Sequence, residues 1–208
     1  MHSRHDLVWL TPRGWDAALA RALPGQHEAI EQWQGQGWPA VVRRDEAGAA
    51  PGNVSLGLAL PPDADGVKRR IALHAPESEI AKSAPALPLL DAADAAPAHW
   101  RPALDMLAHA LPLRAFGSLA LQAITGQAYL TPKSDIDLLF HPTTRSMLDA
   151  GLAIMSASPL PLDGEIVFPS GDAVAWKEWA GAERVLVKSV ASVRLAPIAE
   201  LLATLEDA

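Results

Sequence analysis

Apolar and polar positions in the first 75 residues follow two different periods. Short runs rich in Val, Leu and Ile, bounded by Pro, Gly and Asp, are typical of strands. Apolar residues four positions apart, such as Trp15 and Leu19, indicate amphipathic helices. The predicted strands are Leu7–Leu10, Val41–Arg43, Val54–Leu60 and Arg70–Leu73, and the predicted helices lie near Trp15–Leu23 and Glu28–Gln34. This part of the chain is therefore predicted to form a small α+β unit.

The second half shows the same two patterns in closer alternation. Trp100, Leu104, Leu107 and Leu111 keep helical spacing over His99–Leu111. The next predicted segments are strand Leu113–Phe116, a tight turn at Gly117-Ser118, helix Leu119–Thr125, strand Ser134–Leu139, helix Thr143–Met155, strand Leu162–Phe168, strands near Ala173–Trp179 and Val185–Lys188, and helix Ile198–Leu205. Strands that alternate with helices predict an α/β domain with a mixed sheet.

An Ala- and Pro-rich stretch separates the two halves. Residues 84–98 contain Pro85, Pro88 and Pro97 and few strand formers, so we predict a connector there. The predicted organisation is an N-terminal α+β domain over residues 1–83 and a larger α/β domain over residues 99–208. With 208 residues, 50% of them hydrophobic, the chain is long enough to form two cores.

Two aspartates in the second half are the most informative residues for function. Asp135 and Asp137 are two positions apart on a predicted strand, so they point to the same face, while Ile136 and Leu138 point toward a core. Paired anions repel each other unless a hard cation lies between them, and Mg²⁺ binds carboxylate oxygens together with substrate phosphates. The pattern predicts a metal and phosphate site. The alternative is that both aspartates are solvent-facing residues of an amphipathic strand.

The segment before the aspartates favours the catalytic interpretation. Gly117 and Ser118 stand between a predicted strand and a predicted helix whose N-terminal N–H groups suit an anion. Together with the Asp-x-Asp strand, this unit resembles the nucleotidyltransferase fold of polymerase-beta-like enzymes. That resemblance implies that Gly117 and Ser118 hold a triphosphate and that Asp135 and Asp137 bind metal. The spacing from Ser118 to Asp135 is longer than usual for the superfamily, because residues 127–133 form an extra turn.

A third acid is expected on a neighbouring strand, where it would bridge two metal ions and activate the attacking oxygen. Asp163 and Glu165 share one face of the predicted strand Leu162–Phe168, and Asp163 is the first choice. The alternative is a turn aspartate and a solvated strand glutamate. The metal prediction is therefore one or two Mg²⁺ ions held by carboxylates drawn from Asp135, Asp137, Asp163 and Glu165.

Charge and composition exclude several classes of protein. The 24 acidic residues outnumber the 17 Lys plus Arg, and the formal net charge of −7 argues against broad binding to a nucleic-acid backbone. The absence of cysteine excludes disulfides, thiolate catalysis and cysteine-based zinc sites. The sequence has no run of about eighteen apolar residues and does not begin with the pattern of a secretory signal. We therefore expect a cytoplasmic protein that binds neither nucleic acid nor membranes.

Basic residues provide candidate phosphate contacts. Arg43 and Arg44 follow an apolar run, and a second basic cluster, Lys68-Arg69-Arg70, precedes another. Each cluster suits a phosphate or an acidic protein, and each is equally consistent with a solvated strand end. Lys188 lies on a predicted strand near the end of the chain, where its alternative role is that of an edge lysine that limits strand pairing.

Several segments carry a closer resemblance. They are Arg4–Leu10, Val41–Arg44, Leu56–Leu58, Phe116–Gly126, Ser134–Leu139, Asp163–Glu165 and Val185–Lys188. Together they resemble the malonate decarboxylase holo-acyl-carrier-protein synthases, the MdcG family of phosphoribosyl-dephospho-CoA transferases, over essentially the whole chain. One departure is Leu121, where an aromatic residue is expected before Gln122.

The resemblance implies a specific reaction. The donor is triphosphoribosyl-dephospho-CoA, the acceptor is a serine of the apo acyl-carrier subunit of malonate decarboxylase, and pyrophosphate is released. Mg²⁺ on Asp135 and Asp137 would neutralise phosphate oxygens, a third acid would orient or deprotonate the serine, and Lys188 would offset charge on the pyrophosphate. The N-terminal domain, with Arg43 and Arg44, is expected to contact the donor or the carrier.

Two other functions are compatible with the same residues. One is a nucleotidyltransferase that uses an ordinary nucleoside triphosphate on a different hydroxyl acceptor. The other is an assembly protein that retains the fold without turnover, which the intact Gly-Ser and Asp-x-Asp motifs argue against.

Overall fold

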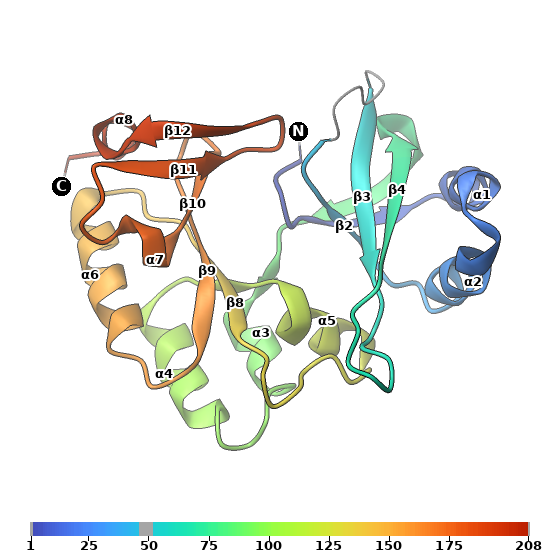
Figure 1. The fold of residues 1–208 in the computed structure, drawn as a ribbon, viewed down its shortest axis with the longest axis horizontal. Coiled ribbons are helices and arrows are strands. Elements are labelled where there is room, and N and C mark those ends of the chain that lie inside the picture. Colours follow the sequence, from blue (N-terminus) through green and yellow to red (C-terminus); the bar gives the residue numbers. More distant parts are fainter. Residues whose placement is uncertain (1, 46–51, 208) are drawn as a thin grey trace. The chain divides into compact units, whose positions relative to one another are not determined.

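The computed structural model describes residues 2–45 and 52–207. The chain divides into two compact units, Met1–Ala86 and Leu87–Ala208, which we call the first and second domains (Figure 1). Each domain is built around its own β-sheet.

The first domain contains a five-stranded antiparallel sheet in the order β4-β3-β2-β1-β5. Its elements are β1 (Leu7–Leu10), α1 (Pro12–Arg21), the 3-10 helix η1 (Pro24–Gln26), α2 (His27–Gly35), β2 (Ala40–Val42), β3 (Asn53–Ala59), β4 (Arg70–Pro76), the 3-10 helix η2 (Glu77–Glu79) and β5 (Ile80–Ala84). The helices bury the apolar faces that the sequence predicts, with Ile30 and Trp33 almost fully enclosed. Helix α1 begins at Pro12 because Thr11 caps it, accepting a hydrogen bond from the Gly14 backbone at 3.1 Å.

The second domain contains a seven-stranded sheet in the order β12-β11-β10-β9-β8-β7-β6. Its elements are β6 (Leu87–Pro88), α3 (Leu89–Ala93), α4 (Arg101–Ala110), β7 (Arg114–Ala115), α5 (Gly117–Thr125), β8 (Ile136–Phe140), α6 (Arg145–Ser156), β9 (Leu162–Val167), β10 (Ala173–Ala175), α7 (Trp176–Trp179), β11 (Arg184–Lys188), β12 (Val193–Pro197) and α8 (Ile198–Leu202). Among the strand pairs described, β8 and β9 form the parallel one, and α6 connects them.

The core of the second domain explains the apolar positions of β8 on either side of Asp137. Ile136, Leu138 and Phe140 are buried against apolar side chains from several helices. Gly151 of α6 allows the Phe140 ring to approach, because a Cβ at this position would lie 2.2 Å from a ring carbon. The opposite face of β8 is thereby left to Asp137.

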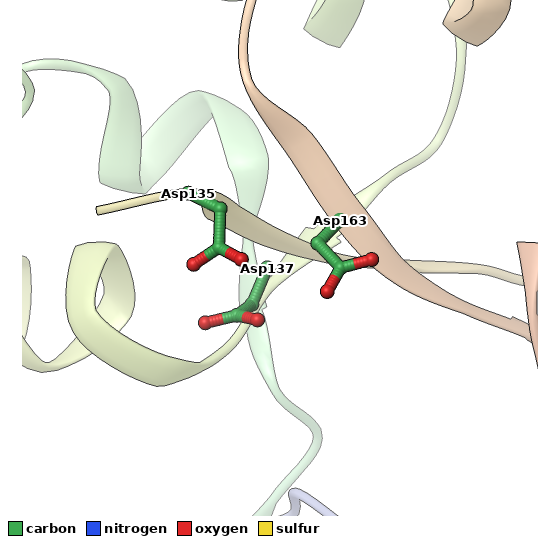
Figure 2. A group of neighbouring side chains, drawn as sticks. All are labelled: Asp135, Asp137 and Asp163. Carbon is green, nitrogen blue, oxygen red and sulfur yellow. The ribbon is translucent and has the colours of Figure 1, made fainter. Parts of the chain in front are cut away.

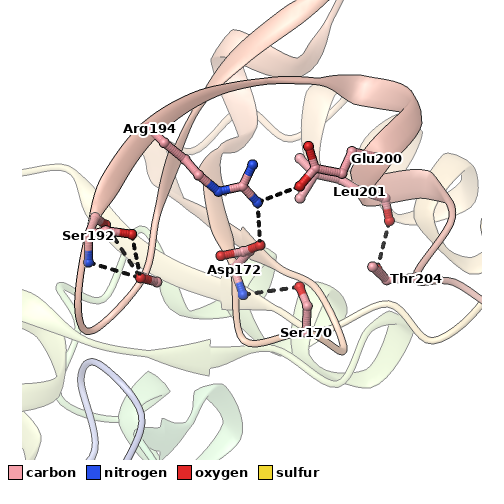
Figure 3. Close-up of polar contacts among 8 residues, drawn as sticks. Ser170, Asp172, Ser192, Arg194, Glu200, Leu201 and Thr204 are labelled. Carbon is pink, nitrogen blue, oxygen red and sulfur yellow. Dashed lines mark hydrogen bonds and ion pairs between the residues drawn. The ribbon is translucent and has the colours of Figure 1, made fainter.

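An ion-pair network fastens the outer end of this sheet (Figure 3). Arg194 of β12 donates to Asp172 at 2.9 Å and lies 2.7 Å from a carboxylate oxygen of Glu200 in α8. The hydrogen bonds to Glu200 and then to Asp172 raise the pKa of the Arg194 guanidinium above its ordinary value. The network ties β12 to the β9–β10 turn and to α8.

The structure corrects three predictions about the elements. Residues 84–98 are not a connector: β6 and α3 lie there, and Leu89, Ala92 and Ala96 belong to the second core. The prolines did not prevent packing, because small alanine side chains fit closely between helices. The domain boundary accordingly lies at residues 86 and 87. The predicted strand near Ala173–Trp179 ends at Ala175 and continues as α7.

The third correction concerns Gly117, which begins α5 instead of forming a separate turn with Ser118. Its φ of +63° reverses the chain directly into the helix. In the part of the chain that the structure describes, no helix has the length and apolar character needed to cross a membrane.

Candidate active site

Two of the predicted acids are brought together by backbone pairing. Asp137 on β8 is directly opposite Asp163 on β9 in the parallel register, so the two side chains lie on the same face of the sheet. Gly164 is needed for this close pairing, because its φ is +139° and a Cβ there would lie 1.9 Å from the Leu138 carbonyl oxygen. The two carboxylates are half-buried.

Asp135 reaches the same place from a loop. It immediately precedes β8, at the end of the segment 127–135 that follows α5. Gln122 of α5 fastens this segment: its Oε1 accepts hydrogen bonds from the backbone of Tyr129 and Leu130, both at 3.0 Å. Its Nε2 donates to the Ala95 carbonyl at 2.6 Å. The extra turn noted in the sequence is therefore anchored to α5 and to the start of the domain.

Tyr129 adds a buried anchor to the same loop. Its side chain is only 1% exposed. Burial raises the pKa of the Tyr129 hydroxyl to about 12, and a hydrogen bond with Thr125 partly offsets that rise. Because the neutral phenol suits this site and the phenolate does not, the loop is held by an uncharged ring at ordinary pH.

Asp135, Asp137 and Asp163 form one cluster (Figure 2). Each offers a carboxylate oxygen, and these oxygens lie within 4.8 Å of one another. Oxygens bound to one Mg²⁺ at about 2.1 Å lie at most about 4.2 Å apart, so small side-chain rotations suffice to coordinate a shared ion. The donor set, all carboxylate oxygen, fits a hard divalent cation. Of the two candidates for the third acid, the structure brings Asp163 to the cluster.

Gly117 lies directly against the cluster. A Cβ at Gly117 would be 2.0 Å from Oδ2 of Asp137, so a side chain at this position would displace the carboxylate. Ser118 follows in the first turn of α5 and is 8% exposed. The residue before the helix, Phe116, makes no side-chain cap to α5. A helix N-terminus next to a cation site is a suitable environment for phosphate.

A lysine that the sequence did not single out contacts the cluster. Nζ of Lys177 in α7 lies 3.4 Å from Oδ1 of Asp163, with the two side chains 55% and 42% exposed. An exposed ion pair of this kind contributes little stability. Nothing in the sequence distinguishes Lys177, because the predicted strand over Ala173–Trp179 gave no reason to direct its side chain toward Asp163.

Glu165 and Lys188 form a separate pair on the same sheet face. Glu165, predicted as a further metal ligand, lies outside the described aspartate cluster. Its side chain is 8% exposed and lies 3.3 Å from Nζ of Lys188. Lys188 is not an isolated edge lysine, because β12 pairs with its strand on the outer side.

The two predicted arginines belong to the first domain. Arg43 is half-buried, donates from Nε to the Leu56 carbonyl at 2.9 Å and lies 3.4 Å from Nε2 of His74. Arg44 is exposed. These two contacts of Arg43 are to its own sheet, and a role of either arginine in substrate binding stays a prediction.

The second domain thus has the order of elements on which the resemblance to nucleotidyltransferases is based: a strand, a helix that begins at Gly117-Ser118, and acids on the next two strands of a mixed sheet.

Comparison with known proteins identifies the family. The phosphoribosyl-dephospho-CoA transferase MdcG N-terminal domain matches residues 3–86, and the MdcG C-terminal domain matches residues 87–199. This chain belongs to the phosphoribosyl-dephospho-CoA transferase family, and it is a transferase enzyme. The boundary between the two matched family domains, at residues 86 and 87, coincides with the boundary between the two structural domains.

Individual relatives support the same family over nearly the whole chain. A phosphoribosyl-dephospho-CoA transferase of Xanthomonas campestris pv. campestris (strain 8004) is 41% identical, over 95% of both chains. That of Bradyrhizobium diazoefficiens is 39% identical over 92% of this chain and 88% of its own. That of Pseudomonas putida (strain W619) is 33% identical over 92% and 91%. No solved structure gives a significant match.

Proposed function

We propose that this protein transfers the phosphoribosyl-dephospho-CoA group from triphosphoribosyl-dephospho-CoA to a serine of the apo acyl-carrier subunit of malonate decarboxylase. The observation that carries the proposal is the convergence of Asp135, Asp137 and Asp163 beside the N-terminus of α5, in a chain of the phosphoribosyl-dephospho-CoA transferase family. The serine oxygen forms a bond to the innermost phosphorus, the bond from that phosphorus to pyrophosphate breaks, and pyrophosphate leaves.

In this reaction the three aspartates would hold one or two Mg²⁺ ions. Bound Mg²⁺ supplies charge neutralisation at the phosphate oxygens. Asp163, the half-buried member on β9, is proposed to orient the incoming serine and accept its proton. Backbone N–H groups at Gly117 and Ser118 are proposed to bind phosphate oxygens, and Lys188 to offset charge on the pyrophosphate.

The first domain is proposed to bind the dephospho-CoA part of the donor or the carrier. Arg43 and Arg44 are its candidate contacts, and exposed Arg44 is the better placed for an external ligand. We propose that the reaction takes place in the cytoplasm and involves neither nucleic acid nor a membrane.

Intact-mass analysis of the apo carrier tests the proposal. The carrier is incubated with the protein, Mg²⁺ and either triphosphoribosyl-dephospho-CoA or ATP. A mass gain with the former alone is expected. A gain with ATP would favour a nucleotidyltransferase that uses ordinary nucleotides, and no gain with either donor from folded protein would overturn the proposal.

The Asp135→Asn variant tests the site within that assay. Loss of one metal ligand is expected to slow transfer by at least ~10³-fold, because metal binding stabilises the transition state by several kcal/mol. Asp149→Asn is the matched control, since Asp149 is an exposed residue of α6. Transfer at the wild-type rate by the Asp135 variant would remove this residue from the mechanism.

A further inference from the structure

Glu165 is a buried carboxylate close to the aspartate cluster but outside it, as far as the described residues show. It lies two residues after Asp163 on β9 and on the same face, about 7 Å farther along the strand. Its side chain is only 8% exposed, and its carboxylate accepts a hydrogen bond from Nζ of Lys188 at 3.3 Å. A buried carboxylate needs such a partner, because an unpaired charge is strongly disfavoured away from water.

Strand β10 lies between Glu165 on β9 and Lys188 on β11, and its small side chains allow the two to come into contact. On β10, Ala175 is opposite Glu165, and Ala173 is opposite both Val167 and Lys188. Directly opposite residues share a face, so both alanines lie between β9 and β11 on the side that carries Glu165 and Lys188. Their methyl groups leave space for the long Lys188 side chain to cross β10. The 4% exposure of Ala173 agrees with a strand that is covered at this point.

The Lys188 ammonium is bonded to Glu165 and is still accessible to solvent. Its side chain is 32% exposed, whereas that of Glu165 is almost enclosed. An ammonium group has three donors, and one bond to Glu165 leaves it able to bind further anionic oxygens. Buried ion pairs are weak evidence for a role in stability, because an apolar pair of similar volume is often equally stable. We therefore consider the partly exposed Lys188 ammonium as a ligand contact and not as a source of stability.

We propose that Glu165 is a positioning residue that fixes the Lys188 ammonium beside the aspartate cluster, where Lys188 binds the polyphosphate chain of the donor. The inference rests on the proposed function only in the identity of that donor. In this proposal Glu165 holds Lys188 and is not a metal ligand. The metal cluster and the Lys188 ammonium then contact the same polyphosphate from two adjacent positions of one sheet face.

Binding of inorganic triphosphate in the presence of Mg²⁺, measured by calorimetry, tests this proposal without requiring transfer. Lys188→Met is expected to weaken binding by roughly 10- to 100-fold, the effect of losing a charged hydrogen bond. Glu165→Gln keeps the ammonium but releases it, so a smaller weakening is expected. The double variant Glu165→Gln/Lys188→Met removes both charges and is expected to bind as weakly as Lys188→Met.

Two further measurements separate this role from a structural or metal-binding one. Mn²⁺ affinity, followed by electron paramagnetic resonance, is expected to stay unchanged in Glu165→Gln. KM for triphosphoribosyl-dephospho-CoA is expected to rise more than kcat falls in the double variant. Arg145→Met is the matched control, because Arg145 is an exposed cation of the same domain, 3.7 Å from Asp207.

Three results would overturn the inference. Triphosphate binding by the folded double variant at wild-type affinity would make the pair structural. Unchanged or tighter triphosphate binding by Glu165→Gln would remove its positioning role, and weakened Mn²⁺ binding by that variant would make Glu165 a metal ligand. If the carrier is not modified yet triphosphate binding depends on Lys188 and Glu165 as expected, the proposed reaction fails and the polyphosphate site stands.

Discussion

The three aspartates of the cluster are held in two different ways. Asp137 and Asp163 are fixed by the backbone register of the parallel strands β8 and β9. Asp135 is delivered by the loop before β8, which is anchored by the Gln122 side chain and the buried Tyr129 ring. The strand-held half depends on backbone geometry, whereas the loop-held half depends on a few side-chain contacts. We therefore expect the two halves to respond to different perturbations.

Among changes that keep all three carboxylates, the largest effect is expected from the strand-held half, through Gly117→Ala. The added methyl would lie 2.0 Å from Oδ2 of Asp137, and the flexible carboxylate is the group that moves. A displacement of about 1 Å in a catalytic group lowers the rate roughly 100-fold, and we expect a loss of that order in transfer. Carrier modification, followed by intact mass, measures it.

Gly126→Ala provides the control for backbone strain. Gly126 ends the same helix with a φ of +71°, close to the +63° of Gly117, but no atom lies within 4 Å of a Cβ there. Both variants carry the left-handed strain, about 1–2 kcal/mol, and only one carries the clash. Equal loss of transfer in the two variants would show that strain, and not the approach to Asp137, is responsible.

A smaller effect is expected from the loop-held half, through Gln122→Leu. This change removes the acceptor of the Tyr129 and Leu130 N–H groups and the donor to Ala95. We expect the free energy of unfolding to fall by about 2 kcal/mol, as for buried polar groups that lose their partners. Transfer is expected to fall about tenfold as Asp135 loses its fixed position. Denaturant unfolding and the transfer assay measure the two effects.

Gln127→Leu is the matched control, because it is the same substitution in the loop that Gln122 anchors. Its backbone is bonded to Thr125, but its side chain has no hydrogen bond in the described part of the chain. Similar losses in both variants would assign the effect to added apolar surface and not to the anchoring bonds.

The smallest effect at neutral pH is expected from the ionisation of Tyr129, the second anchor of the loop that holds Asp135. At high pH this ionisation tests how far the loop-held half depends on the buried ring. Its pKa in the folded protein is about 12, above the ordinary value of 10.0. Folding favours the neutral phenol of Tyr129, so its burial adds to the free energy of unfolding. This contribution is complete below about pH 10 and is lost as the pH rises through 12. The shift corresponds to roughly 3 kcal/mol.

Tyr129 is the only tyrosine of the chain, so the ultraviolet absorbance of tyrosinate reports on it alone. The folded protein is expected to titrate near pH 12, and the unfolded protein near pH 10. A folded-state midpoint near 10 would mean that the ring is accessible and that the loop does not depend on it.

The elements near the acids follow closely from the sequence, because local patterns determine them. Alternation over Ile136–Phe140 predicts both the strand and the shared face of Asp135 and Asp137, and helical spacing predicts α4 and α6. Asp163 was preferred over Glu165 as the third acid, and the structure places Asp163 in the cluster.

Contacts between distant segments could not be predicted in the same way. The pairing of β8 with β9 sets which residue of β9 faces Asp137, and no local pattern encodes that register. The contact of Lys177 with Asp163 depends on how β10 and α7 lie beside β9, and Lys188 reaches Glu165 because the two alanines of β10 are small. The role of residues 84–98 depended on helix packing that composition alone does not reveal.

The parallel pairing of β8 with β9 also sets when the acids meet during folding. Parallel neighbours require a crossover, here the residues between Phe140 and Leu162, which include α6. Closing that loop costs chain entropy before the contacts between the strands repay it, so non-local pairing of this kind is slow. We therefore expect local helices to form before Asp137 and Asp163 come together. The acid cluster is completed only when the crossover has closed.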